Sequence, residues 1–299
     1  MVINKPQIYK TDKNFLGIEE KYSSYEESKV VIIPIPFEAT TSYGQGTALG
    51  PEAILNASHY VEFFDEETNR EMCFEKGICT LHKIEFKNLN IEKAFKKIYD
   101  VILKEIKNNK FVVTLGGEHS ISNPIIRAHF EYYKKFSVLH FDAHSDLRQE
   151  YEGSKFSHAS FAARVYEFNS DIIQVGIRAQ CKEEAEFISK NKIKTFYAYE
   201  IRQGKYGVKW QEKVLRALKE NVYLTFDVDF LDPSIMPSTG TPEPGGFFWD
   251  ETLKMFKMLG EKKNVIGFDV VELSPKKDLP FADFITAKLI YKMLNYFVK

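Results

Sequence analysis

The sequence has few cysteines: among its 299 residues only Cys73, Cys79 and Cys181 carry a thiol. An odd and sparse set of this kind argues against a disulfide framework and is typical of a reducing compartment. Cys73 and Cys79 have no second pair of cysteines beside them, so we interpret them as ordinary thiols rather than as metal ligands.

Long apolar runs and basic blocks are also absent. No stretch reaches the roughly 18 consecutive apolar residues of a membrane-spanning helix, and the polar residues 1–29 lack a signal-peptide pattern. The formal net charge is −1 and the 41 lysines and arginines are spread along the chain, so nothing favours nucleic acid or membrane as partner. We therefore expect a cytoplasmic protein.

Short apolar runs alternate with longer segments of helical periodicity, and no linker is long enough to separate domains. This alternation predicts one α/β domain over residues 1–299, with residues 1–28 as an N-terminal segment packing on it. We expect a three-layer αβα fold with a mostly parallel central sheet and helices on both faces. The predicted strands are 30–35, 111–115, 137–141, 171–177, 195–199, 222–226 and 265–271, and the predicted helices are 51–63, 91–108, 183–190, 209–220, 251–259 and 282–297.

Unusual polar sequence follows four of the predicted strands, where the ligand site of such a sheet is expected. His119 follows a Gly-Gly turn after the strand 111–115, and Glu272 ends the strand 265–271. Alternate residues of an extended chain share a face, so the side chains that follow the other two strands project together. These are Asp142, His144 and Asp146 after one strand and Asp227 and Asp229 after the other.

Several aspartates in one pocket repel one another unless a cation neutralises them, so we predict a metal site. Taken singly, a strand-end histidine is more often structural and an Asp-x-Asp pair is often a solvated turn. Two imidazoles and four carboxylates without a thiolate suit manganese, iron or cobalt, and zinc also accepts them. Six such ligands can hold two ions, which together can lower the pKa of a shared water.

The polar motifs, taken together, resemble those of the ureohydrolase family, which contains arginase and agmatinase. The resemblance covers almost the whole chain and is carried by several motifs in order. They are the segment 36–43 with 50–54, Gly-Gly-Glu-His-Ser at 116–120, Asp-Ala-His-Ser-Asp at 142–146, Asp-Val-Asp-Phe-Leu-Asp-Pro at 227–233 and the segment 240–246.

The resemblance implies an arginase-like fold and a centre of two Mn²⁺ ions. One ion would be held by His119, Asp142, Asp146 and Asp227, and the other by Asp142, His144, Asp227 and Asp229. Asp142 and Asp227 would bridge the two ions. Glu118 stands where many members have Asp, and we expect little effect because it lies beside a ligand.

Two further residues match family positions that act on the substrate. Glu272 would receive the guanidinium, and a carboxylate can pair with a planar guanidinium bidentately. His158 would shuttle protons, a role that suits histidine near neutral pH. A surface Glu and a surface His remain the plain alternatives. His140 shares the face of Asp142 and is either an outer partner of the metal ligands or a packed core residue.

The loop 148–155 lacks the Thr/Ser/Asn-rich sequence that arginases use to hold an amino-acid head group. Ala179, Gln180 and Cys181 likewise stand where arginases have Asp-x-Asp. Glu150 and Glu152 would suit a cationic tail. The expected substrate is therefore a small cationic guanidine, agmatine first, which would give putrescine for polyamine biosynthesis and urea. Aminopropylagmatine, arginine and guanidino acids remain alternatives.

Two other classes of function stay open. A deacetylase-like enzyme has a similar fold but uses one zinc ion, and His119 together with Asp229 argues against it. A non-catalytic metal-binding or regulatory relative is the second, and the intact ligand set with Glu272 argues against it. The family often forms trimers or hexamers, so the resemblance also implies a homo-oligomer.

Overall fold

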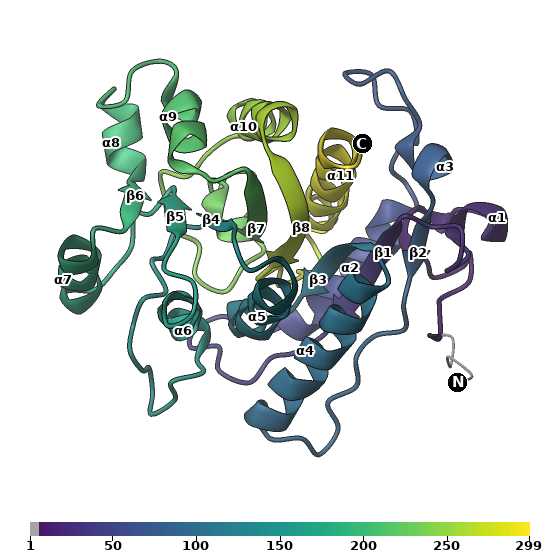
Figure 1. Cartoon of the computed structure of the whole chain (residues 1–299), viewed down its shortest axis with the longest axis horizontal. Helices are drawn as coiled ribbons and strands as arrows, with labels where there is room; N and C mark the ends of the chain where they lie inside the picture. Colours follow the sequence, from purple (N-terminus) through teal and green to yellow (C-terminus); the bar gives the residue numbers. More distant parts are fainter. Residues whose placement is uncertain (1–5) are drawn as a thin grey trace.

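A single sheet of eight strands forms the middle of the molecule in the computed structural model, which describes residues 6–299 (Figure 1). All the strand pairs are parallel, and the order across the sheet is β2-β1-β3-β8-β7-β4-β5-β6. The strands are β1 Val30–Ile35, β2 Ile78–Thr80, β3 Phe111–Gly116, β4 Ser137–Phe141, β5 Ile172–Val175, β6 Lys194–Phe196, β7 Asn221–Asp227 and β8 Asn264–Val271.

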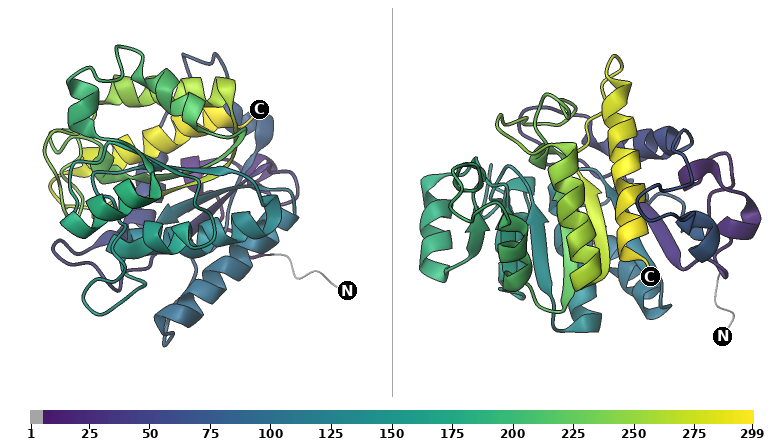
Figure 2. Two further views of the ribbon diagram at one scale, coloured as in Figure 1. Left: turned by 60° about the vertical axis from the view of Figure 1, so that its left-hand side comes forward. Right: turned by 90° about the horizontal axis from the view of Figure 1, so that it is seen from above.

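Helices cover both faces of the sheet, which confirms the predicted three-layer arrangement (Figures 1 and 2). On one face lie α4 Ile91–Lys107, α5 Ser122–Tyr133, α6 Phe161–Tyr166 and α7 Lys182–Asn191. On the other lie α2 Gly50–Ser58, α8 Ala198–Arg202, α9 Trp210–Ala217, α10 Trp249–Lys262 and α11 Pro280–Phe297. The short helices α1 Glu20–Ser23 and α3 Met72–Lys76 flank the β2 edge. No helix within residues 6–299 is long and apolar enough to cross a membrane.

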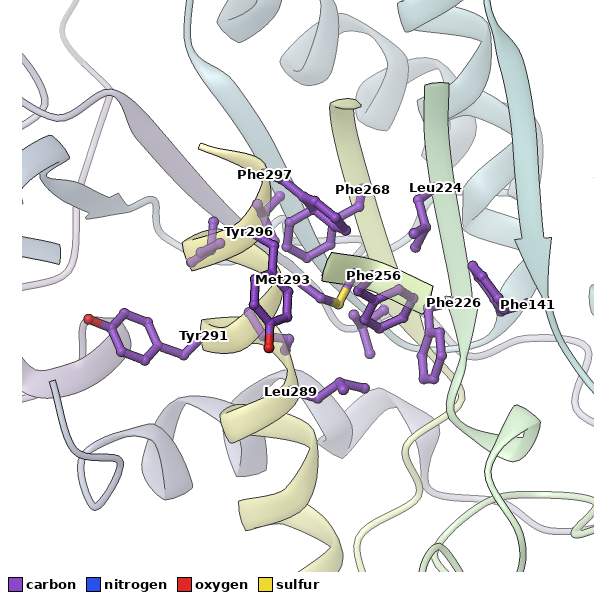
Figure 3. Close-up of a cluster of buried hydrophobic side chains, with 14 of the residues drawn as sticks. Phe141, Leu224, Phe226, Phe256, Phe268, Leu289, Tyr291, Met293, Tyr296 and Phe297 are labelled. Carbon is purple, nitrogen blue, oxygen red and sulfur yellow. The ribbon is translucent and has the colours of Figure 1, made fainter. Parts of the chain in front are cut away.

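The strands are apolar on both faces because each face packs against helices. Figure 3 shows the core beneath α10 and α11, where the rings of Phe226, Phe256 and Phe141 meet. Residues 6–28 contribute to this core, since Phe15 and Leu16 are buried in it. The first five residues of the predicted N-terminal segment lie outside the described part of the chain.

Several predicted boundaries were wrong. The strand predicted for 195–199 ends at Phe196, and α8 begins at Ala198. The strand predicted for 171–177 spans only 172–175, and the helix predicted for 51–63 ends at Ser58. The three-residue edge strand β2 and the helices α5 and α6 were not predicted.

The order of the strands in the sheet determines where the predicted ligand residues lie. Strands β3, β8, β7 and β4 are consecutive neighbours in the sheet, although they are scattered along the sequence. These are the four strands followed by the polar motifs. Because all run in one direction, their carboxyl ends meet at one edge, and the predicted ligands are brought to the same place.

Candidate active site

His119 lies among three carboxylates that come from two different strands. Its Nδ1 atom is 3.0 Å from Asp142 Oδ2, 3.4 Å from Asp146 Oδ2 and 3.3 Å from Asp227 Oδ2. The three aspartates follow β4 or end β7, whereas His119 begins a short 3-10 helix, His119–Ile121, after β3. Four of the six predicted ligands therefore surround one point.

A second group adjoins the first and shares Asp142 with it. His144 Nδ1 is 2.8 Å from Asp229 Oδ2 and 3.5 Å from Asp142 Oδ1. Asp142 thus turns one oxygen toward His119 and the other toward His144. Asp227 Oδ1 accepts a 2.8 Å hydrogen bond from the backbone N–H of Asp229, which ties the two aspartates after β7 together. All six predicted residues lie in two adjoining groups.

The carboxylates are crowded enough to change their pKa values. Burial and the charges of Asp229 and Asp142 raise the pKa of Asp227 well above its ordinary value. Burial and the Asp142 charge raise the pKa of Asp146 to about 6. Burial alone would lower the pKa of His119, but the three nearby carboxylates raise it well above its usual value. The pocket thus attracts positive charge.

The donor set fits a metal ion. Within the described residues, the buried Nδ1 atom of His119 has no hydrogen-bond partner, although three carboxylates lie within 3.4 Å. A buried polar atom without a hydrogen-bond partner destabilises the fold unless a bound ion or an ordered water interacts with it. Imidazole nitrogen with carboxylate oxygens is the mixture that manganese, iron, cobalt or zinc accepts.

A hydrogen-bonded chain fixes the orientation of His119 and was not predicted from the sequence. His119 Nε2 lies 2.9 Å from Thr225 Oγ1, and the Thr225 hydroxyl donates to Asp269 Oδ1 at 2.6 Å. Tyr223 also donates to Asp269, at 2.7 Å. Such partners hold a ligating histidine in one ring orientation. The signal was present for Thr225, which stands two residues before Asp227 on the same face of β7.

His140 contacts the centre rather than only filling the core. Its Nε2 atom is 2.7 Å from Asp142 Oδ2, and Gln174 Nε2 lies 3.1 Å from its Nδ1 atom. Since the amide of Gln174 donates to Nδ1, the Nε2–H donates to Asp142. His140 therefore supports the shared carboxylate, the first of the two alternatives that the sequence left open.

Glu272 lies beside the centre and is held in a strained backbone conformation. Its Oε1 atom accepts a 2.6 Å hydrogen bond from the backbone N–H of His119, and its φ angle is +65°. Asp146 also has a positive φ, +52°. Conformations of this kind in residues other than glycine cost about 1–3 kcal/mol and are concentrated at functional sites. Burial and repulsion from Glu118 raise the pKa of Glu272 well above its ordinary value.

His158 faces the same pocket and is linked to Glu118 through Thr40. The Thr40 hydroxyl donates to Glu118 Oε1 at 2.8 Å, accepts from the His158 backbone N–H at 2.9 Å and lies 3.4 Å from His158 Nδ1. Glu118 also accepts from the backbone N–H groups of Ala39 and Thr40 at 2.6 and 2.7 Å. Glu118 therefore anchors the segment that holds His158. Burial lowers the pKa of His158.

These residues lie at a pocket of about 290 Å³. Its lining includes His144, Asp146, Asp227, Asp229, His158 and Glu272 from the predicted set, together with Tyr151, Gln180 and Glu243. Glu150 and Glu152 are exposed and are not part of this lining. The lining also contains Glu243, for which the sequence indicated no role.

Comparison with known proteins shows which family and which relatives this chain is similar to. Residues 28–296 match the arginase family. The chain is 39% identical over 289 residues to an N(1)-aminopropylagmatine ureohydrolase of Synechocystis, covering 95% of this chain and 94% of that protein. It is 31% identical over 276 residues to an agmatinase of Pyrococcus horikoshii, covering 90% and 92%.

A solved structure shares the same architecture. The agmatine ureohydrolase of Thermoplasma volcanium superimposes with a TM-score of 0.83 at 28% sequence identity. The superposition covers 95% of this chain and 94% of the other. The likeness therefore extends over the whole sheet, its covering helices and the edge that carries the site.

Proposed function

Because this chain belongs to the arginase family, we propose that it hydrolyses the guanidino group of agmatine to putrescine and urea. The observation that carries the proposal is the placement of Glu272 beside two adjoining His/Asp groups in one pocket. A guanidinium bound at Glu272 would lie in the same pocket as these His and Asp residues. Metal-assisted hydrolysis of a C–N bond needs this juxtaposition.

In the proposal, the six His and Asp residues hold two divalent ions. One ion would be held by His119, Asp142, Asp146 and Asp227, and the other by Asp142, His144, Asp227 and Asp229. When bound, such ions supply Lewis acidity that lowers the pKa of water. Manganese is our first choice, and iron, cobalt and zinc are alternatives.

Glu272 and His158 act on the substrate in this scheme. Glu272 accepts N–H groups of the guanidinium with the oxygen that the His119 backbone leaves free. His158, whose lowered pKa keeps it neutral near pH 7, can accept a proton and return it to the leaving amine. Water adds to the guanidino carbon, the bond to the alkyl nitrogen breaks, and that nitrogen leaves as the amine.

A second substrate has a specific observation in its favour. The relative at 39% identity is named for N(1)-aminopropylagmatine, whereas the agmatinase of Pyrococcus horikoshii is at 31%. Agmatine and its aminopropyl derivative carry the same guanidine and the same four methylenes, so both fit the scheme above. Arginine fits less well, because Ala179 and Gln180 offer the pocket no carboxylates for an amino-acid head group.

Urea release tests this proposal. We expect the Mn²⁺-loaded protein to release urea from agmatine or aminopropylagmatine with a catalytic efficiency at least about tenfold above that for arginine, or about 1.4 kcal/mol. Removal of metal with a chelator should abolish release, and added Mn²⁺ should restore it. Asp229→Asn should be inactive, and Asp278→Asn, at an exposed aspartate, serves as the matched control. No urea from any guanidine in the metal-loaded protein would refute the proposal.

Three further features belong to the same proposal and rest on the resemblance or the composition. Residues 1–299 form one domain, and the protein works as a homo-oligomer, a trimer or hexamer. The three thiols are free, which suits a cytoplasmic location. Light scattering coupled to gel filtration measures the oligomeric state directly.

A further inference from the structure

The pocket wall beside His144 is formed by the segment 239–243, which follows the ligand motif after β7. The side chain of Glu243 is 40% exposed, and its Oε1 atom lies 4.0 Å from His144 Nε2. The Nδ1 atom of His144 faces Asp229 and Asp142, whereas its Nε2 atom, on the other side of the ring, faces Glu243. Within residues 6–299, no group donates a hydrogen bond to the Glu243 carboxylate.

The backbone of Glu243 is held firmly although its side chain is not. Arg178 donates to the Glu243 carbonyl oxygen from Nη2 at 2.9 Å and from Nε at 3.3 Å, and it also donates to the Asp229 carbonyl at 2.6 Å. Asp232 Oδ2 accepts from the backbone N–H groups of Gly245 and Gly246 at 3.1 and 3.0 Å. The carboxylate is therefore free to bind something while its position relative to the ligand residues is fixed, which lowers the entropic cost of binding.

The other acidic groups of this pocket lining already have partners. Glu184 is buried, and its two oxygens accept from the backbone N–H groups of Leu147 and Cys181 at 2.9 and 2.7 Å. Glu272 and the aspartates belong to the centre described above. The positive group of the lining, Arg148, stacks over the Tyr151 ring, 4.9 Å from its centroid. Among the described residues that line the pocket, Glu243 is thus the acidic side chain outside the centre that accepts no hydrogen bond, and its ion-pair contact is the 4.0 Å approach to His144 Nε2.

We propose that Glu243 binds the ammonium group at the far end of the substrate's four-carbon chain and so selects cationic guanidines. This inference rests on the proposed function and adds the residue that recognises the ammonium end of the substrate. The guanidine end is placed at Glu272 beside the metal ligands, so the alkyl chain runs outward past His144 toward the wall. In aminopropylagmatine the inner ammonium follows the same four methylenes, and one carboxylate can therefore serve both substrates.

A second role for Glu243 would have different consequences. A carboxylate near the outer nitrogen of a ligating histidine can orient that histidine and strengthen metal binding. In that case Glu243→Gln would weaken metal binding and affect every guanidine alike. If Glu243 binds the tail, its loss affects only guanidines that carry an ammonium.

The test compares agmatine with butylguanidine, which carries its guanidine on the same number of carbon atoms but has no terminal ammonium group. Glu243→Gln should lower kcat/KM for agmatine about tenfold, since an ion pair at a half-exposed site is worth roughly one such factor. The inhibition constant of butylguanidine, measurable whether or not it is turned over, should change less than about twofold. Glu243→Lys should weaken agmatine further and tighten 4-guanidinobutyrate, whose tail is negative. Glu220→Gln, just before β7 at the opposite end of the strand, is the matched control.

Each outcome decides the question. Equal effects of Glu243→Gln on agmatine and butylguanidine, or a fall in bound metal measured by elemental analysis, would overturn tail recognition and favour the positioning of His144. No change with either compound would also overturn it. If the wild-type protein releases no urea from agmatine or aminopropylagmatine, the proposed function itself fails, a result visible before any variant is made.

Discussion

Replacing Thr40 with valine removes one hydroxyl at nearly constant volume and breaks the link between Glu118 and His158. That hydroxyl donates to Glu118 at 2.8 Å and accepts from the His158 backbone N–H at 2.9 Å. The backbone N–H groups of Ala39 and Thr40 still bind Glu118, so the segment should stay near its place. We therefore expect Thr40→Val to fold and to keep its metal, but to hold His158 less firmly.

The magnitude follows from the two lost bonds. A hydrogen bond to a charged group contributes about 1.5–3 kcal/mol, and a buried N–H left without a partner costs about 1–3 kcal/mol. The contributions share one residue and are not additive, so we expect the free energy of unfolding to fall by about 2–4 kcal/mol. A general acid–base group contributes about 10²–10⁴-fold to turnover. Thr40→Val should lose at least about tenfold, and no more than His158→Asn loses.

The assay measures turnover of agmatine, bound metal and the midpoint of denaturant unfolding for the wild type, Thr40→Val, Thr40→Ser, His158→Asn and the double variant. Thr40→Ser keeps the hydroxyl and should restore most of the turnover. The double variant Thr40→Val with His158→Asn should be no slower than His158→Asn alone, because both act on the same histidine. Wild-type turnover in Thr40→Val, or equal losses in the valine and serine variants, would refute the reasoning.

Three other substitutions have distinct expected results. Asp227→Ala should lose bound metal and nearly all turnover, because it removes a shared carboxylate; two tightly held ions in that variant would contradict the ligand assignment. Glu272→Gln should keep its metal but lose about 1.5–3 kcal/mol of transition-state binding, read from kcat/KM, if Glu272 pairs with the guanidinium. Lys292→Met should lower the free energy of unfolding by about 3–5 kcal/mol, because it leaves buried Asp65, 2.9 Å away, without its positively charged partner. The double variant Lys292→Met with Asp65→Asn should recover much of that lost stability. Denaturant unfolding measures both variants, and equal stability of the two would contradict the explanation.

The hydrophobic pattern predicted seven of the eight strands, because a buried parallel strand is a continuous apolar run. It missed β2, whose three residues are too short to give a pattern. It also missed α5, whose Asn123, Ile125 and Phe130 are weak helix formers. Packing of α5 against α4 and the sheet provides the stability that local propensity does not.

By itself, the sequence determined the candidate ligands. The spacing of Asp142, His144 and Asp146 predicts a shared face for an extended chain, an argument that needs no knowledge of the fold. In the structure Asp146 departs from extended backbone, with a φ of +52°. Only the tertiary structure decided which side chains surround them. Glu118 reaches Thr40 across 78 residues, and the pocket wall carries Glu243 instead of Glu150 because loop paths depend on packing over the whole sheet. Contacts between distant segments arise only once the strand order is set, so spacing along the chain does not reveal them.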